Sequence, residues 1–178
     1  LGNISFPDGP VTGPVEVSWL GSPHESLLTP QRTQSLSRAP DGTWTLPALP
    51  VGPLRVAIRS GNFVTYGDLE GPLPGSVQGN FGWGLEPGQR VEFTLFDYND
   101  DPLATTEVYV IITSELGERR FTTTTDADGR VLVEGLWPWD DSTVRFIVPD
   151  GSAYPEETTV TPNGDDPQQI EVRSFGIG

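Results

Sequence analysis

The sequence has 178 residues with 25 acidic and ten basic side chains, so its formal net charge is −15. Nucleic-acid binding needs a basic surface that releases phosphate counterions. Spanning a bilayer needs roughly 18 consecutive apolar residues, and no segment approaches that length. We therefore expect neither nucleic acid as a partner nor membrane insertion.

Short runs in which apolar and polar residues alternate predict half-buried β-strands. In the first half these runs cover residues 15–19, 44–46, 54–58 and 91–95, with an edge strand expected around 33–37. Turn residues such as Gly, Pro and Asp separate the runs. The stretch 66–88 is dense in Gly and Pro, which predicts a long irregular loop rather than a strand pair.

The same pattern starts again in the second half. Predicted strands cover residues 108–112, 119–125, 131–133, 144–148, 158–160 and 170–172. No window favours a helix of three turns at a period of 3.6 residues. The expected fold class is all-β, with two tandem small antiparallel β-sandwich domains of the immunoglobulin-like or transthyretin-like kind.

An internal repeat supports the division into two domains. Three sets of residues match in order and spacing: Asp41-Gly42, Trp44 and Leu46 with Asp128-Gly129, Val131 and Val133; Arg55, Val56 and Ile58 with Arg145, Phe146 and Val148; and Val91 and Phe93 with Ile170 and Val172. We place the domains at residues 1–96, with the loop 66–88, and 97–178. The net charge is −3 in the first and −12 in the second, so the acidic surface belongs to the second domain.

The Asp-Gly turns carry a resemblance. Thr125-Asp126-Ala127-Asp128-Gly129-Arg130-Val131 and Asp41-Gly42-Thr43-Trp44, each followed by a Leu and a further strand, resemble the carboxypeptidase regulatory-like, or transthyretin-like, β-sandwich domains. The resemblance implies an accessory or spacer domain of a secreted bacterial protein. The related Cna-B-type pilin and adhesin domains often carry a Lys–Asn isopeptide bond, which this sequence excludes because it has no Lys.

No catalytic set is recognisable. His24 is the only histidine, and it lies in a polar loop. A solvated loop histidine explains it more simply than the base of a Ser-His-Asp site. One His and no Cys exclude a structural zinc site of the usual kind. Carboxylates are numerous, but nothing places two at the separation that a glycosidase needs. We therefore predict that the chain is not an enzyme and has no cofactor, calcium excepted.

Calcium is the metal that the sequence favours, because Asp carboxylates on loops are the hard oxygen ligands that it prefers. Asp97, Asp100 and Asp101 cluster at the predicted domain junction and are the candidate ligands. Asp is also common in turns for reasons of local hydrogen bonding, so solvated turn acids explain the same cluster.

Aromatic residues in loops are the candidate contacts for a ligand or partner. Trp137 and Trp139 flank a proline beside two aspartates, and Phe81 and Trp83 lie in the 66–88 loop. They could stack on sugar rings, anchor a protein partner, or close one end of a sandwich. The sequence leaves these alternatives open.

The leading hypothesis is a non-enzymatic structural or protein-interaction module, which is a segment of a larger bacterial surface or envelope protein. The chain does not begin with Met, and this favours an excised or processed segment. Its expected location is extracellular or in the cell envelope. Its expected partners are proteins or neighbouring domains of the same polypeptide. The alternatives are a carbohydrate-binding module that uses the loop tryptophans on a polysaccharide, and an accessory domain of a secreted enzyme.

Overall fold

The computed structural model describes residues 3–5, 14–21, 32–38, 44–45, 54–69, 80–82, 84–114, 117–149, 154 and 157–174. All regular structure among these residues is β-strand, which confirms the predicted all-β class. The chain separates into two compact units, Leu1–Pro87 and Gly88–Gly178. Within the described part of the chain, no helix has the length and apolar character to cross a membrane.

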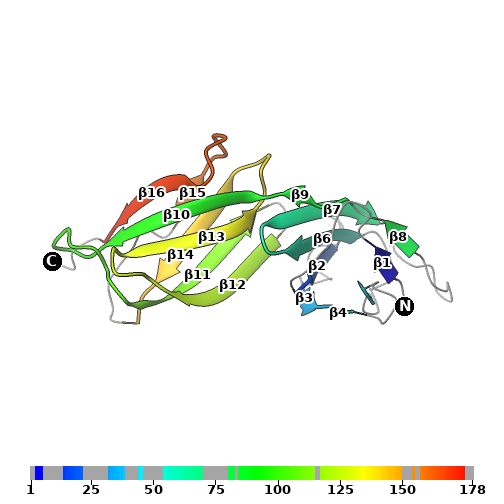
Figure 1. Cartoon of the computed structure of the whole chain (residues 1–178), viewed down its shortest axis with the longest axis horizontal. Helices are drawn as coiled ribbons and strands as arrows, with labels where there is room; N and C mark the ends of the chain where they lie inside the picture. Colours follow the sequence, from blue (N-terminus) through cyan, green and yellow to red (C-terminus); the bar gives the residue numbers. More distant parts are fainter. Residues whose placement is uncertain are drawn as a thin grey trace. The chain divides into compact units, whose positions relative to one another are not determined.

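The second unit is a β-sandwich whose two sheets have the strand orders β13-β10-β16 and β12-β11-β14-β15 (Figure 1). Its strands are β10 (Gln89–Phe96), β11 (Glu107–Ser114), β12 (Gly117–Thr124), β13 (Arg130–Leu136), β14 (Ser142–Ile147), β15 (Thr158–Val160) and β16 (Gln168–Arg173). Burial alternates along β10 and β13, as the sequence pattern predicts for strands with one face on a core.

The core of the second unit lies between these two sheets. Val91, Phe93 and Leu95 of β10 are fully buried and face Phe146 and Val144 of β14. The rings of Phe93 and Phe146 meet edge to face, with centroids 5.0 Å apart, so this pair joins the sheets at the centre of the sandwich. The alternating residues of the sequence therefore supply the core as predicted.

The described residues of the first unit also form two sheets, with the strand orders β4-β5-β1-β8 and β3-β2-β6-β7-β9. Its strands are β1 (Asn3–Ser5), β2 (Glu16–Gly21), β3 (Arg32–Ser35), β4 (Ser37–Arg38), β5 (Trp44–Thr45), β6 (Leu54–Ser60), β7 (Phe63–Leu69), β8 (Asn80–Gly82) and β9 (Glu86–Pro87). Val17, Trp19, Trp44 and Val56 are buried.

The two units share one strand order. The sheets β5-β1-β8 and β3-β2-β6-β7 correspond strand by strand to β13-β10-β16 and β12-β11-β14-β15, with the same parallel and antiparallel neighbours. β4 and β9 are additions to the first unit. The correspondence of β5 with β13 and of β6 with β14 agrees with the internal repeat seen in the sequence.

The predicted boundary after residue 96 differs from the division at Pro87 and Gly88. β10 pairs with β13 on one side and β16 on the other, so it is the first strand of the second unit rather than the last of the first. The sequence match of Val91 and Phe93 with Ile170 and Val172 therefore joins two neighbouring strands of one sheet. Alternation identifies a strand, but it does not identify the sheet that the strand joins.

Of the stretch 66–88, the structure describes residues 66–69, 80–82 and 84–88, and strands occur among these where a loop was predicted. Residues 66–69 belong to β7, which forms a hairpin with β6 across Gly61 and Asn62, and β8 and β9 follow. Gly61 has a φ of 55°, which a two-residue hairpin turn often requires. Among residues 63–67, the part of β7 whose burial is described, only Val64 is buried, so this part shows no clear alternating pattern.

Among the described residues, each unit has one parallel strand pair that the antiparallel prediction did not include. These pairs are β1 with β8 and β10 with β16. The two members of each pair lie far apart in the sequence, because parallel neighbours need a long crossover connection. In the second unit, the chain between β10 and β16 passes through the strands of the opposite sheet and through β13 before it returns beside β10.

Candidate functional site

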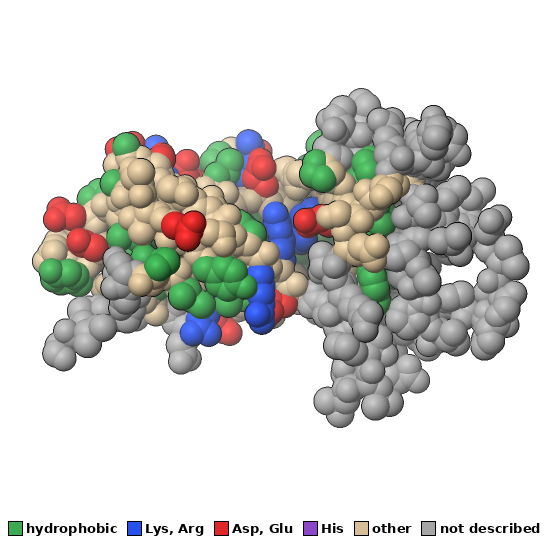
Figure 2. Space-filling view, turned by 90° about the horizontal axis from the view of Figure 1, so that it is seen from below, with side chains coloured by type: hydrophobic (Ala, Val, Ile, Leu, Met, Phe, Trp, Pro, Cys, Tyr) green, Lys and Arg blue, Asp and Glu red, His purple; other side chains and the backbone are tan. Residues whose placement is uncertain are grey.

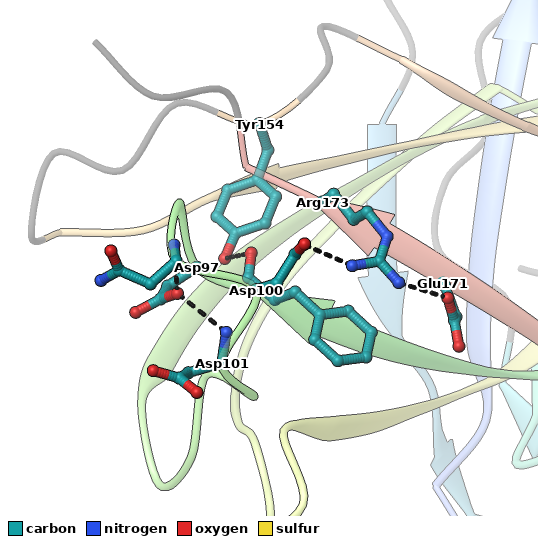
Figure 3. Close-up of polar contacts among 8 residues, drawn as sticks. Asp97, Asp100, Asp101, Tyr154, Glu171 and Arg173 are labelled. Atoms are coloured by element: carbon teal, nitrogen blue, oxygen red, sulfur yellow. Dashed lines mark hydrogen bonds and ion pairs between the residues drawn. The ribbon is translucent and has the colours of Figure 1, made fainter. Parts of the chain in front are cut away.

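The loop that follows β10 is organised by Asp97. Its Oδ1 accepts hydrogen bonds from the backbone N–H groups of Asn99 at 2.7 Å and Asp101 at 3.1 Å (Figure 3). The backbone N–H of Asp97 donates to the carbonyl of Asp101 at 2.8 Å. These contacts are typical of a turn in which Asp replaces a backbone acceptor, so the side chain of Asp97 shapes the loop.

Arg173, at the end of β16, connects this loop to the last strand. Its guanidinium forms an ion pair with Asp100 and a second, at 2.9 Å, with Glu171. The same group lies over the ring of Phe96, 4.5 Å from the centroid. The hydrogen bond to Asp100 is the main cause that raises the pKa of Arg173 above its ordinary value. Asp100 has a φ of 65°, a backbone conformation in which Asp is tolerated better than most residues.

The carbonyl of Phe96 is a second point of attachment. It accepts hydrogen bonds from the hydroxyl of Tyr154 and from the backbone N–H of Ser174, both at 3.0 Å. We call Phe96, Asp100 and Arg173 the end clamp, because the contacts of Arg173 connect the end of β16 to the end of β10 and to the loop that follows it (Figure 3). The sequence carries no signal for this arrangement, since Arg173 and Asp100 are 73 positions apart.

The predicted calcium ligands lie close in sequence, but their carboxylates have different contacts. Asp97 accepts two backbone N–H groups and Asp100 is paired with Arg173. In the part of the chain that the structure describes, no three His, Cys, Asp or Glu side chains are grouped as a metal site would require. Calcium at Asp97, Asp100 and Asp101 therefore remains a prediction from the sequence alone.

The Asp-Gly motif at residues 125–131 has a structural role in the same end of the sandwich. Oδ1 of Asp126 accepts the backbone N–H groups of Asp128 at 2.8 Å and Arg130 at 2.9 Å. The buried hydroxyl of Thr125 donates to the carbonyl of Leu103, and it accepts the N–H of Thr106 at 2.9 Å. The motif thus holds the turn between β12 and β13 against the loop after β10.

The two tryptophans of the 137–141 loop have different environments. Trp137 is buried, with 7% of its surface exposed, whereas Trp139 is 70% exposed. Asp140 and Asp141 beside it are exposed as well. The two residues are separated only by Pro138, and side chains in a loop follow no fixed period from which this difference could be predicted. Trp139 is therefore the member of the pair whose surface is exposed.

The remaining sequence candidates are described only in part. Phe81 belongs to the backbone of β8, but its side chain lies outside the described residues, as do Trp83 and His24. Other large apolar side chains are exposed, and Figure 2 shows hydrophobic surface beside acidic and basic groups on the described part of the chain. The exposed large apolar side chains besides Trp139 are Phe63, Tyr66, Tyr98, Leu132 and Ile147.

Polar side chains also connect the beginnings of β10 and β16. Gln89 is buried and donates to Gln168. Arg90 forms a two-pronged ion pair with Asp166, with N–O distances of 2.7 and 3.1 Å. These partners are more than 70 positions apart, so sequence reasoning missed them. We call these four residues the start contacts.

The Arg90–Asp166 pair gives a prediction for pH. The hydrogen bond from Arg90 lowers the pKa of the Asp166 carboxyl below its ordinary value. Because the folded-state pKa is depressed, the pair contributes to stability above the unfolded-state pKa, and this contribution is lost as the pH falls through the folded-state pKa. Both groups are exposed to solvent, so we expect a small effect that added salt reduces further.

NMR titration of the Asp166 carboxyl tests this directly. Replacing Arg90 by Gln should raise the pKa of Asp166 towards its ordinary value. Arg145→Gln removes the same charge from an exposed position on β14 and serves as the control. An equal response to both replacements would show that net charge, and not the pair, lowers the pKa.

Comparison with solved structures finds similar chains, two of which are pilins. The Streptococcal ancillary pilin is 14% identical with a TM-score of 0.35, and the match covers 98% of this chain and 62% of the pilin. The shaft pilin SpaA from Lactobacillus rhamnosus GG is 12% identical with a TM-score of 0.36, over 99% of this chain and 97% of that one. The Bacillus anthracis TIE protein is 16% identical with a TM-score of 0.35, over 97% of this chain and 33% of that protein.

No protein-family model matches the chain, and no curated protein matches it in sequence. The structural likenesses have low identity and low TM-scores, so they do not assign a family. The all-β sandwich fold stands on the strands and sheets of the chain itself.

Proposed function

We propose that this chain is a non-enzymatic structural segment of a larger bacterial surface or envelope protein. The observation that carries the proposal is the repetition of one strand order in two consecutive units. A chain built from copies of one sandwich extends its reach by adding units, and this suits a spacer that holds other domains away from an anchoring point. The finer assignment, to the carboxypeptidase regulatory-like class, is supported by the Asp-Gly turn at residues 128–129.

Contacts with partners belong to the loops in this proposal, because loops tolerate change while the sandwich keeps its position. Trp139 is 70% exposed and stands beside the exposed carboxylates of Asp140 and Asp141. An exposed Trp is a frequent anchor in protein interfaces. We therefore propose a protein, or a neighbouring domain of the same polypeptide, as the partner of this loop.

The location of the protein tests the proposal. Antibodies raised against this chain are expected to label intact cells of the source organism, and protease added to those cells should remove the signal. An abundant cytosolic protein, probed in the same cells, should keep its signal and serves as the control for lysis. Recovery of the chain in the cytosolic fraction, protected from added protease, would contradict the proposal.

A further inference from the structure

We propose that the second unit resists tension along the chain, and that the parallel β10–β16 pair is the element that carries the force. This inference rests on the proposed role as a spacer in a surface protein. It goes beyond the spacer role, because it concerns the resistance to force that follows from the parallel direction of β10 and β16.

The direction of pairing determines how a pull is distributed. The chain enters the second unit at the start of β10 and leaves the described residues at the end of β16. The two strands are parallel neighbours, with six register pairs from Val91–Gln168 to Phe96–Arg173. A pull on the two ends therefore acts along the strands in opposite directions, and the ladder hydrogen bonds are loaded together. If these strands were antiparallel, the same pull would open their bonds one after another from one end.

The core opposes sliding of β10. Val91, Phe93 and Leu95 are fully buried, and Phe93 meets Phe146 of the opposite sheet. β10 is also paired along its other edge with β13. Because side chains alternate between the two faces, a slip by one residue would turn these three side chains away from the core. The ladder therefore yields only when part of the core is disrupted.

Side-chain contacts hold both ends of the same strand pair. The start contacts join Gln89 to Gln168 and Arg90 to Asp166. At the other end, the end clamp joins Arg173 to Asp100 and to the ring of Phe96. Each set links residues close to β10 with residues close to β16. They consequently resist the displacement that tension would cause.

The first unit repeats the essential geometry. Among its described residues, β1 and β8 are parallel, with the register pairs Asn3–Asn80, Ile4–Phe81 and Ser5–Gly82. A second strand pair of the same kind and at the same place in the strand order supports a mechanical role for the arrangement.

Pulling the full chain in two directions tests the proposal. The sequence has no Cys, so attachment points can be introduced singly at chosen sites. Gly88→Cys with Gly178→Cys loads β10 and β16 along their length. Gly88→Cys with Asp165→Cys pulls the starts of the same two strands apart, across the ladder. Single-molecule force spectroscopy at one pulling rate then compares one folded unit in two directions.

We expect the unfolding force along the strands to be at least about twofold higher than the force across them, because the ladder shares the load among all its bonds. The two double-Cys variants are also denatured chemically in free solution. Equal denaturation midpoints would show that the direction of pulling, and not a difference in stability, causes the difference in force. Equal unfolding forces in the two directions would overturn the proposal. The proposed spacer function would not be affected by that result, because the labelling of intact cells tests it separately.

A variant of the end clamp makes the test more specific. Arg173→Gln should lower the force along the strands and leave the force across them unchanged. Arg120→Gln is the matched control, since it removes an exposed Arg that also pairs with a Glu two positions earlier, but on the edge strand β12. If the two replacements lower the force equally, the end clamp has no part in resisting tension.

Discussion

Replacing Phe93 by Ala is expected to lower the free energy of unfolding of the second unit by about 3–5 kcal/mol. The side chain is fully buried at the centre of the sandwich and contacts the ring of Phe146 edge to face. Its removal takes away the hydrophobic contribution of the ring and leaves a cavity between two sheets that cannot close without moving their strands. This is the largest effect that we expect from any single replacement.

Calorimetry on the full chain measures this effect as a lower melting temperature of the transition that belongs to the second unit. Leu132→Ala is the control, because Leu132 lies in the same unit but is 47% exposed, and we expect a change within about 0.5 kcal/mol. Phe146→Ala and the double variant complete a cycle, from which we expect a coupling of about 0.5–1.5 kcal/mol. Similar losses for Phe93→Ala and Leu132→Ala would contradict the assignment of the core.

Gly129→Ala is expected to destabilise the second unit by about 3 kcal/mol or more, from two causes. Gly129 has a φ of 76°, which is strained for Ala. In addition, a Cβ at this position would lie 2.8 Å from the carbonyl oxygen of Leu95 and 2.9 Å from the backbone nitrogen of Leu103. Those two atoms are hydrogen-bonded to each other at 2.8 Å, so neither can move away freely.

Gly164→Ala separates these two causes. Gly164 also has a positive φ, of 85°, but no atom lies within 4 Å of a Cβ built there. We therefore expect only the conformational cost, about 1–2 kcal/mol. Denaturant unfolding of the two full-length variants gives the comparison. If Gly129→Ala is no more destabilising than Gly164→Ala, the close contacts of Gly129 with the backbone do not contribute to the stability of the second unit.

Some of these features could be predicted from the sequence, and others could not. The alternation of apolar residues predicted β10, β11, β13 and β14, together with Phe93 and Phe146 as inward-facing residues. The Asp-Gly motif predicted a turn at residues 128–129. Such signals are local, since a half-buried strand repeats every two residues and a turn needs particular residues at particular positions.

The candidate site was predicted less well, because its contacts join residues distant in the sequence. Asp100 and Asp97 were predicted as neighbours, but the partner of Asp100 is Arg173, which no short motif connects to it. The buried Trp137 and the exposed Trp139 could not be distinguished either. Both belong to a loop, where side-chain direction follows the packing of the loop and not a period.

The residue pattern predicts an all-β protein with two related halves. The composition excludes a disulfide, which needs Cys, and a Lys–Asn isopeptide bond, which needs Lys. That β10 opens the second unit and lies parallel to β16 became visible in the fold and could not be predicted from the strand pattern. The reason is physical: alternation shows that a strand has a buried face, whereas its neighbours and their direction follow from how distant strands pack around one core. The proposed resistance to tension depends on that direction.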